Sequence, residues 1–297
     1  MNLQSIDTRI KKFSARPDVQ ENLIEAVVKR LKWRLHWMVT DEPQVVSYAE
    51  TLKINIPKSG SGSLIYYQGF SEIETATFVR SFLDLGMIFV DVGAHIGEYT
   101  LLAAKLVGET GEVHAFEPQP SLFPLLQDSI QINNFDHVKP NQLALCDHIG
   151  EVEFEVFDEP SVSSIKKQSS TKTAAEIIRV STTSLDIYST EIGRKIDLIK
   201  VDVEGAEKLV FEGATSLMSR SESEAPAWIF EYAPNAYAQF GYQTQDLLDL
   251  LYQHDYQVYR YSHETGELSD FSPDVPPLGI INLIAAKDKE ALIDQLT

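Results

Sequence analysis

From residue 73 onward, short apolar runs alternate with segments in which apolar residues recur at helical spacing. The runs have the length and composition of buried strands, at Ile88–Val92, Val113–Glu117, Ile196–Val201 and Trp228–Tyr232. The helical patterns fall at Ile73–Leu85, Glu98–Leu106, Leu122–Ile132, Glu207 to about Met218, and Thr244–Gln253. This alternation predicts an α/β fold, in which a mostly parallel sheet has helices on both faces.

The end of the chain departs from the alternation. Two strands, Tyr256–Tyr261 and Ile280–Ala285, are joined through Gly266 and Pro276-Pro277 without a helical pattern. This connection predicts an antiparallel hairpin at the edge of the sheet. A third strand of the parallel part is expected at roughly Gln142–Cys146, where apolar residues form another short run.

The region that follows is less regular. Residues 151–157 alternate between apolar and acidic side chains, as in a strand with one solvated face. Ser161–Thr173 is rich in Ser, Lys and Thr, a composition that marks a mobile loop. The loop is either a plain linker or a lid over a substrate, and its composition does not choose between them.

The first 70 residues have their own pattern, so we divide the chain into an extension, residues 1–70, and a main domain, residues 71–297. Glu21–Val39 carries an apolar helical stripe, with basic residues in its last turns. We expect this helix to pack on its own domain or on a second copy in a homo-oligomer; lying on a membrane surface is the alternative. Thr51–Tyr67 has short alternating runs around a Ser-Gly-Ser-Gly tip at 59–62, which predicts a hairpin.

Composition narrows the classes of partner. The chain has 297 residues, 43% of them hydrophobic, and a net charge of −19, which argues against a nucleic acid as partner. The first 40 residues are an exception, with eight Lys or Arg against four Asp or Glu. No apolar run has the roughly 18 residues of a membrane span and the N-terminus has no signal-peptide layout, so we expect a cytoplasmic protein. The single cysteine, Cys146, excludes an internal disulfide.

The strand Ile88–Val92 runs into a glycine turn, Gly93 and Gly97, and then into a helix. Such a turn is typical of nucleotide-cofactor sites, because glycine lets the backbone approach a ligand and the helix start offers free N–H groups. A dinucleotide site has G-x-G-x-x-G, whereas here the spacing is Asp-x-Gly-x-x-x-Gly, with Asp91 inside the end of the strand. A carboxylate suits the ammonium and sulfonium of S-adenosylmethionine and would repel a pyrophosphate. Glu117, which ends the next strand, is placed to hold a ribose diol.

Several longer motifs support this reading. They are Asp91-Val-Gly-Ala-His-Ile-Gly-Glu-Tyr-Thr100, Ala115-Phe-Glu-Pro118, Ala144-Leu-Cys-Asp147 with Gly150, Thr183-Ser-Leu-Asp186 and Ile196-Asp-Leu-Ile-Lys-Val-Asp-Val-Glu-Gly-Ala-Glu207. In this order the segments, over about residues 70–235, resemble the FkbM family of S-adenosylmethionine-dependent methyltransferases. The resemblance implies a Rossmann-like class I methyltransferase sheet of seven strands. It also implies O-methylation of a hydroxyl on a small metabolite, sugar, glycan or polyketide.

The resemblance and the residues together suggest a cofactor site. Asp91 is expected to bind the methionine ammonium, Glu117 the ribose, and the two glycines to give backbone access. His95 and Tyr99 flank the turn; the family usually has Asn where this chain has His95. Ala144 lies where the family's third strand passes the adenine, and its alternative is a plain core position.

Three carboxylates are candidates for the base that takes a hydroxyl proton: Asp202 and Glu204 after the fourth strand, and Glu231 at the end of the fifth. Each also has a structural alternative. Asp202 could cap the following helix, Glu204 could complement the dipole of that helix, and Glu231 could pair with a nearby cation. Asp202 and Glu231 could also share a Mg²⁺ ion, although nothing in the spacing requires a metal. An NAD-dependent oxidoreductase and a non-catalytic binding protein on the same fold are the competing functions.

Overall fold

The computed structural model describes residues 16–58, 60–157, 163–168, 174–275, 277 and 279–297. The chain forms two compact units, Met1–Ser71 and Glu72–Thr297. None of the helices in the described ranges is long and apolar enough to cross a membrane.

The elements of the first unit are α2 (Pro17–Glu21), α3 (Leu23–Val39), β1 (Gln44–Tyr48), β2 (Leu52–Ile56) and α4 (Gly62–Gln68). Helix α3 begins after Asn22, whose side chain accepts a hydrogen bond from the backbone N–H of Glu25. One face of α3 packs within the unit: Ala26 and Trp37 are buried, and the Trp33 ring contacts those of Tyr66 and Tyr67. The other face exposes a stripe of large apolar side chains, Leu23, Ile24, Val27, Val28, Leu31, Leu35, Met38 and Val39.

The hairpin of this unit lies earlier in the chain than the sequence predicted. Strands β1 and β2 pair antiparallel, and the turn between them contains Ala49 and Glu50, both with positive φ. Because neither residue is Gly, Asn or Asp, the turn gives no signal in the sequence. The prediction of a hairpin over Thr51–Tyr67 is therefore wrong: its first half is β2, and its second half is mostly helix α4. Position 59 of the predicted tip lies outside the described residues.

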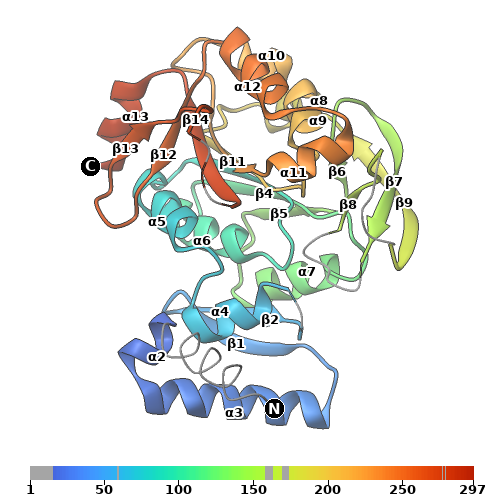
Figure 1. Cartoon of the computed structure of the whole chain (residues 1–297), viewed down its shortest axis with the longest axis vertical. Helices are drawn as coiled ribbons and strands as arrows, with labels where there is room; N and C mark the ends of the chain where they lie inside the picture. The colour runs from blue at the N-terminus through green and yellow to red at the C-terminus, as the bar shows by residue number, and fades with distance from the viewer. Residues whose placement is uncertain (1–15, 59, 158–162, 169–173, 276, 278) are drawn as a thin grey trace. The chain divides into compact units, whose positions relative to one another are not determined.

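The second unit is built on an eight-stranded sheet (Figure 1), in the order β13-β12-β14-β11-β10-β3-β4-β5. The strands are β3 (Ile88–Val92), β4 (Glu112–Phe116), β5 (Val138–Asn141), β10 (Leu198–Val201), β11 (Ala227–Tyr232), β12 (Gln257–Tyr261), β13 (Leu268–Asp270) and β14 (Ile281–Ala286). The five strands from β11 to β5 are parallel. Strand β14 pairs antiparallel with both β11 and β12, and β13 pairs antiparallel with β12. The predicted α/β fold, with an antiparallel C-terminal pair of strands, is confirmed. The short strand β13 adds an eighth strand outside the expected seven.

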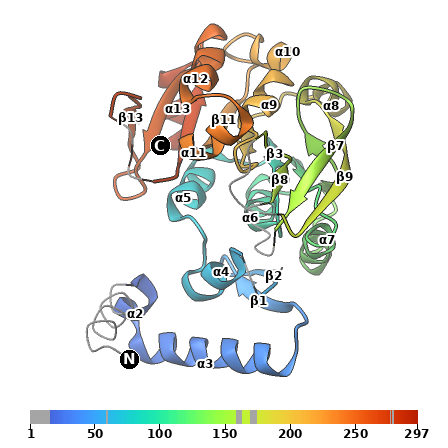
Figure 2. The same cartoon turned by 45° about the vertical axis from the view of Figure 1, so that its right-hand side comes forward.

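Helices cover both faces of this sheet (Figures 1 and 2). They are α5 (Ile73–Phe82), α6 (Glu98–Val107), α7 (Phe123–Ile132), α8 (Leu185–Ile192), α9 (Glu207–Glu212), α10 (Thr215–Met218), α11 (Pro234–Tyr237), the 3₁₀ helix η2 (Ala238–Phe240), α12 (Thr244–Gln253) and α13 (Lys289–Leu296). The segment predicted as one helix from Glu207 to Met218 is two short helices. Gly213 lies between them, and a Cβ there would overlap the backbone oxygen of Cys146.

Alternate residues of the central strands face opposite sides. Val90, Val201 and Phe230 belong to the main core, which α9 and α12 also line. On the other side, Asp91 lies beside Lys200, and Glu231 lies beside Asn282 on the next pair of strands. Charged and amide side chains at buried positions of one sheet face make this side the candidate functional side.

A second, four-stranded sheet has the order β6-β9-β7-β8 (Figure 1). Its strands are β6 (Ala144–Leu145), β7 (Gly150–Val156), β8 (Ser164–Ile165) and β9 (Glu176–Thr183). Strand β7 confirms the strand predicted at 151–157. The prediction of a main-sheet strand at Gln142–Cys146 is wrong: that place is taken by β5, whereas β6 pairs with β9. Strand β5 was missed because its sequence, Val-Lys-Pro-Asn, has little apolar character, which an edge strand does not need.

The predicted loop Ser161–Thr173 is only partly described. Residues 161–162 and 169–173 lie outside the described residues. Between them, β8 pairs antiparallel with β7, and Lys166 forms an ion pair with Glu153 at 2.6 Å. The described part is therefore attached to the small sheet, and its role as a lid or linker stays a prediction.

Candidate active site

The glycine turn after β3 is fixed by close backbone contacts. The backbone N–H groups of Gly93 and Ala94 both donate to the carbonyl of Phe116, at the end of β4. Gly93 has a φ of 82°, and a Cβ there would overlap the backbone oxygen of Asp202. Glycine is required at this position both for its backbone conformation and for the approach of the Asp202 loop. The turn after β3 and the end of β10 are thus in direct contact.

Asp91, the penultimate residue of β3, is buried. Its Oδ2 accepts a hydrogen bond from the Thr100 hydroxyl at 2.6 Å, whereas Oδ1 has no partner among the described residues. Burial raises the pKa of Asp91, and the nearby Lys200 ammonium opposes this shift. A buried carboxylate oxygen without a partner is an acceptor for a ligand such as an ammonium group.

Glu117, at the end of β4, accepts two backbone hydrogen bonds, from His95 N–H to Oε2 at 2.9 Å and from Gln119 N–H to Oε1 at 2.8 Å. These bonds orient the carboxyl group, and each oxygen keeps a lone pair for a further donor. Burial raises the pKa of Glu117 to about 8. Burial also lowers the pKa of His95 to about 4, so its imidazole is neutral at physiological pH.

Lys200 is a site residue that the sequence reasoning missed. It is buried on β10, and its Nζ donates to Asp202 Oδ2 at 2.8 Å and lies 4.8 Å from the centre of the Tyr99 ring. Burial alone would lower the pKa of Lys200, but the charges of Asp202, Asp91 and Glu72 outweigh it and raise that pKa. A lysine inside an apolar strand run was the available signal, because a buried ammonium needs partners.

Glu72, just before α5, links these groups to β14. Its Oε2 accepts hydrogen bonds from the Tyr99 hydroxyl at 3.1 Å and from Asn282 Nδ2 at 2.7 Å. Burial, and then the charge of Asp202, raise the pKa of Glu72. Asn282 was recognisable as an amide within the apolar strand run Ile280–Ala285. Glu72 gave no such signal, because glutamate before a helix is common on surfaces.

The three predicted base candidates come together. Asp202, Glu204 and Glu231 each offer a carboxylate oxygen, and these oxygens lie within 4.8 Å of one another. Glu204 has a φ of 58°, an uncommon conformation for a side chain of this size. Burial, followed by the charge of Asp202, raises the pKa of Glu204 to about 8 and that of Glu231 to about 10.

Glu207 holds the loop that carries two of these carboxylates. It is fully buried, and its Oε1 accepts from the backbone N–H groups of Val203 at 3.1 Å and Gly205 at 3.2 Å. Burial raises the pKa of Glu207 to about 7. The loop is further held by the Tyr242 hydroxyl, which donates to the carbonyl of Gly205 at 2.7 Å. Sequence reasoning treated Glu207 only as part of a motif and missed this positioning role.

Ala144 lies in the other sheet. It is buried on β6, in a small cluster with Phe154 and Val180. Its place beside an adenine stays a prediction.

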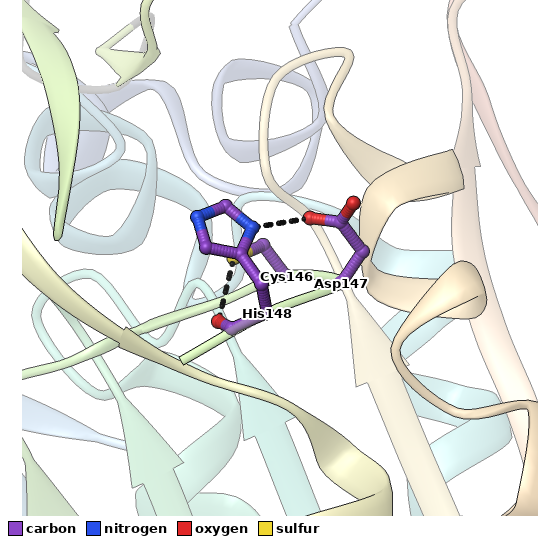
Figure 3. A group of neighbouring side chains, drawn as sticks. All are labelled: Cys146, Asp147 and His148. Atoms are coloured by element: carbon purple, nitrogen blue, oxygen red, sulfur yellow. Dashed lines mark hydrogen bonds and ion pairs between the residues drawn. The ribbon is translucent and has the colours of Figure 1, made fainter. Parts of the chain in front are cut away.

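Cys146, Asp147 and His148 form another group of neighbouring polar side chains (Figure 3). The His148 ring nitrogen Nδ1 lies 2.7 Å from Asp147 Oδ1, and the thiol of Cys146 donates to the carbonyl of His148 at 3.4 Å. Burial raises the pKa of the Cys146 thiol. The buried, protonated thiol is typical of an inert core cysteine, whereas Asp147 and His148 are exposed.

Comparison with protein families identifies the chain. The family model described as the methyltransferase FkbM domain matches residues 91–258, more than half of the chain. The chain belongs to the FkbM methyltransferase family. The family resemblance predicted from the motifs is therefore confirmed, and with it S-adenosylmethionine as the cofactor of an FkbM methyltransferase.

No curated protein matches the chain. Similar solved structures include an S-adenosylmethionine-dependent O-methyltransferase from Thermotoga maritima, with 13% identity, 82% of this chain and 77% of that chain covered, and a TM-score of 0.41. A precorrin-6y C5,15-methyltransferase from Geobacter metallireducens has 12% identity, coverage of 73% and 87%, and a TM-score of 0.41. An rRNA methylase from Streptococcus thermophilus has 13% identity, coverage of 72% and 93%, and a TM-score of 0.40. Likenesses this distant carry no argument about the acceptor.

Proposed function

We propose that this FkbM methyltransferase transfers the methyl group of S-adenosylmethionine to a hydroxyl of a small metabolite, sugar, glycan or polyketide. The observation that carries the proposal is the position of the Asp202 carboxylate, on the loop whose backbone touches the cofactor turn at Gly93. A hydroxyl acceptor needs a base within hydrogen-bond reach, because it is a weak nucleophile at neutral pH.

The residues of the turn fit the cofactor. The free Oδ1 of Asp91 suits the methionine ammonium, and the oriented Glu117 carboxyl suits two ribose hydroxyls. Gly93 and Gly97 leave room for backbone approach, and the start of α6 follows them. Bound there, S-adenosylmethionine would supply a methyl group on a sulfonium sulfur, and the neutral thioether that remains after transfer is a good leaving group.

Asp202 is the base that the surroundings favour. The pKa of Glu204 is about 8 and that of Glu231 about 10, so both hold protons at neutral pH. Asp202 instead pairs with Lys200, and its side chain is 29% exposed against 2% for the lysine. The buried Lys200 ammonium therefore orients the Asp202 carboxylate, whose exposed side is open to an acceptor. In this proposal the free carboxylate oxygen of Asp202 takes the proton of the acceptor's hydroxyl, while the hydroxyl oxygen attacks the methyl group.

The test is transfer of radiolabelled methyl groups to a panel of acceptors with matched hydroxyl, amine and thiol groups. We expect label only on the hydroxyl compounds, and calorimetry should show binding of S-adenosylmethionine and not of NADH. Label on amines alone would refute O-methylation. Binding of NADH instead would favour an oxidoreductase, and cofactor binding without transfer to any acceptor would favour a non-catalytic role.

A further inference from the structure

We propose that Asp202, Glu204 and Glu231 bind one hard divalent metal ion of the Mg²⁺ or Mn²⁺ type. Their three ligand oxygens lie within 4.8 Å of one another. Two oxygens on opposite sides of one Mg²⁺ are about 4 Å apart, at bond lengths of about 2.0–2.1 Å. Carboxylates with no nitrogen or sulfur ligand favour this class of cation over zinc or copper.

Glu231 gives an independent reason for a ligand. Asp202 and Glu204 share one loop, but Glu231 comes from the neighbouring strand β11 and is 8% exposed. Its Oε2 has no hydrogen-bond partner in the part of the chain that the structure describes. A buried carboxylate oxygen without a donor is costly, unless a ligand satisfies it. Asp202 and Glu204 offer further carboxylate oxygens beside it, and a divalent ion that displaces the protons of Glu204 and Glu231 would satisfy all three.

The charge balance points the same way. Asp202 has the Lys200 ammonium at 2.8 Å, and the charges of Lys167 and Lys200 act on Glu204 after those of Asp202 and Glu207. The neighbouring charges with the largest effect on Glu231 are acidic, namely Asp202, Glu207, Glu204 and Glu72. When the three carboxylates are ionised they carry three negative charges, of which the buried Lys200 compensates one. A divalent ion would neutralise the remaining charge of about two.

The metal would lie beside the place that the proposed function gives to the acceptor hydroxyl. A divalent ion lowers the pKa of a bound hydroxyl, so that its proton leaves more readily to a carboxylate of the same cluster. The role in methyl transfer rests on the proposed function, whereas metal binding does not.

Metal binding is tested on the full-length protein, stripped with EDTA and free of cofactor and acceptor. Titration with Mn²⁺, followed by the loss of its free EPR signal, should show one ion per chain that Mg²⁺ displaces. Glu231→Gln should weaken Mn²⁺ binding by about tenfold or more, because it removes a ligand charge. Asp147→Asn is the matched control from the Cys146 cluster and should leave the affinity unchanged. If Glu231→Gln does not fold, as judged by circular dichroism, Glu204→Gln takes its place.

Equal Mn²⁺ affinity in wild type and in the Glu231→Gln or Glu204→Gln variant would overturn the proposal. So would loss of binding in Asp147→Asn alone. The two proposals fail separately: Mn²⁺ binding without methyl transfer to any acceptor would refute only the proposed function. Full transfer rates in EDTA would refute the metal's role in methyl transfer, and the absence of Mn²⁺ binding to the wild type would refute the metal site itself.

Discussion

At the scale of single residues, Asp202 is the group whose loss should affect the reaction and not the fold. If Asp202 is the base, Asp202→Asn should lower kcat by about 10²–10⁴-fold. Cofactor affinity should change little, because Asp91 and Glu117 remain. Single-turnover rates with a true acceptor, together with calorimetry, measure both effects. A variant that reacts at the wild-type rate would exclude Asp202 as base and direct attention to Glu204 and Glu231.

Lys200 should matter for stability, because it is the buried cation among Asp91, Asp202 and Glu72. Lys200→Met leaves those charges without compensation and should cost about 3 kcal/mol of unfolding free energy. Urea unfolding at neutral pH measures the loss. Lys195→Met is the matched control; its exposed pair with Asp197 should be worth less than about 1 kcal/mol. Equal losses in the two variants would contradict a special role for Lys200.

Glu117 predicts a pH dependence. The pKa of Glu117 is about 8 in the folded protein, against an ordinary value of 4.5. Between these values the folded state holds a proton that the unfolded chain has lost, so the contribution of Glu117 to stability falls as pH rises from 4.5 to about 8. Glu117→Gln should remove this fall. Urea unfolding of both proteins at pH 5, 6.5 and 8 is the measurement, and parallel curves would refute the assignment.

At the scale of elements, the turn after β3 should tolerate no side chain at Gly93. Gly93→Ala combines a strained positive φ with overlap on the Asp202 backbone, and should cost about 2–6 kcal/mol of stability. Gly193→Ala is the control: it also has a positive φ, of 66°, but nothing lies within 4 Å of its added Cβ. It should cost about 1–2 kcal/mol. Thermal unfolding separates them, and equal costs would refute the close contact.

The strands and turns also show which elements could be predicted from the sequence pattern and which could not. Strands β3, β4, β10 and β11 were predictable because both of their faces are buried, so their sequences are continuous apolar runs. Strand β5 was not, because an edge strand tolerates lysine and proline. The turn at Ala49 and Glu50 was hidden because its residues are not typical of turns.

The residues of the candidate site also fall into those that the sequence pattern indicates and those that it does not. Asp91, Glu117, Asp202 and Glu231 could be named as candidates from the sequence because each lies at or beside the end of a recognisable strand. Glu72 was not, because it meets Asn282 only through the fold, across 210 positions of sequence. Local pattern identifies residues at strand ends, whereas distant partners depend on tertiary packing.

At the scale of the whole molecule, the apolar stripe of α3 is the feature that a lone chain in water does not explain, because monomers rarely expose such a surface. Within it, Ile24, Val28, Leu31, Leu35 and Met38 are spaced by four, three, four and three residues. This is the heptad spacing of helices that pack against each other. It supports the prediction of a homo-oligomer formed through α3.

We therefore expect sedimentation velocity to show self-association that rises with protein concentration. The double variant Leu31→Glu and Leu35→Glu should be monomeric, because it places charges in the middle of the seam. Leu85→Glu, at an exposed leucine of the second unit, should associate like wild type. A wild-type monomer that binds vesicles of anionic lipid would instead support the membrane alternative, in which Lys29, Lys32 and Arg34 of α3 face the lipid headgroups. A wild-type protein that is monomeric and does not bind such vesicles would contradict both self-association and membrane binding through the stripe.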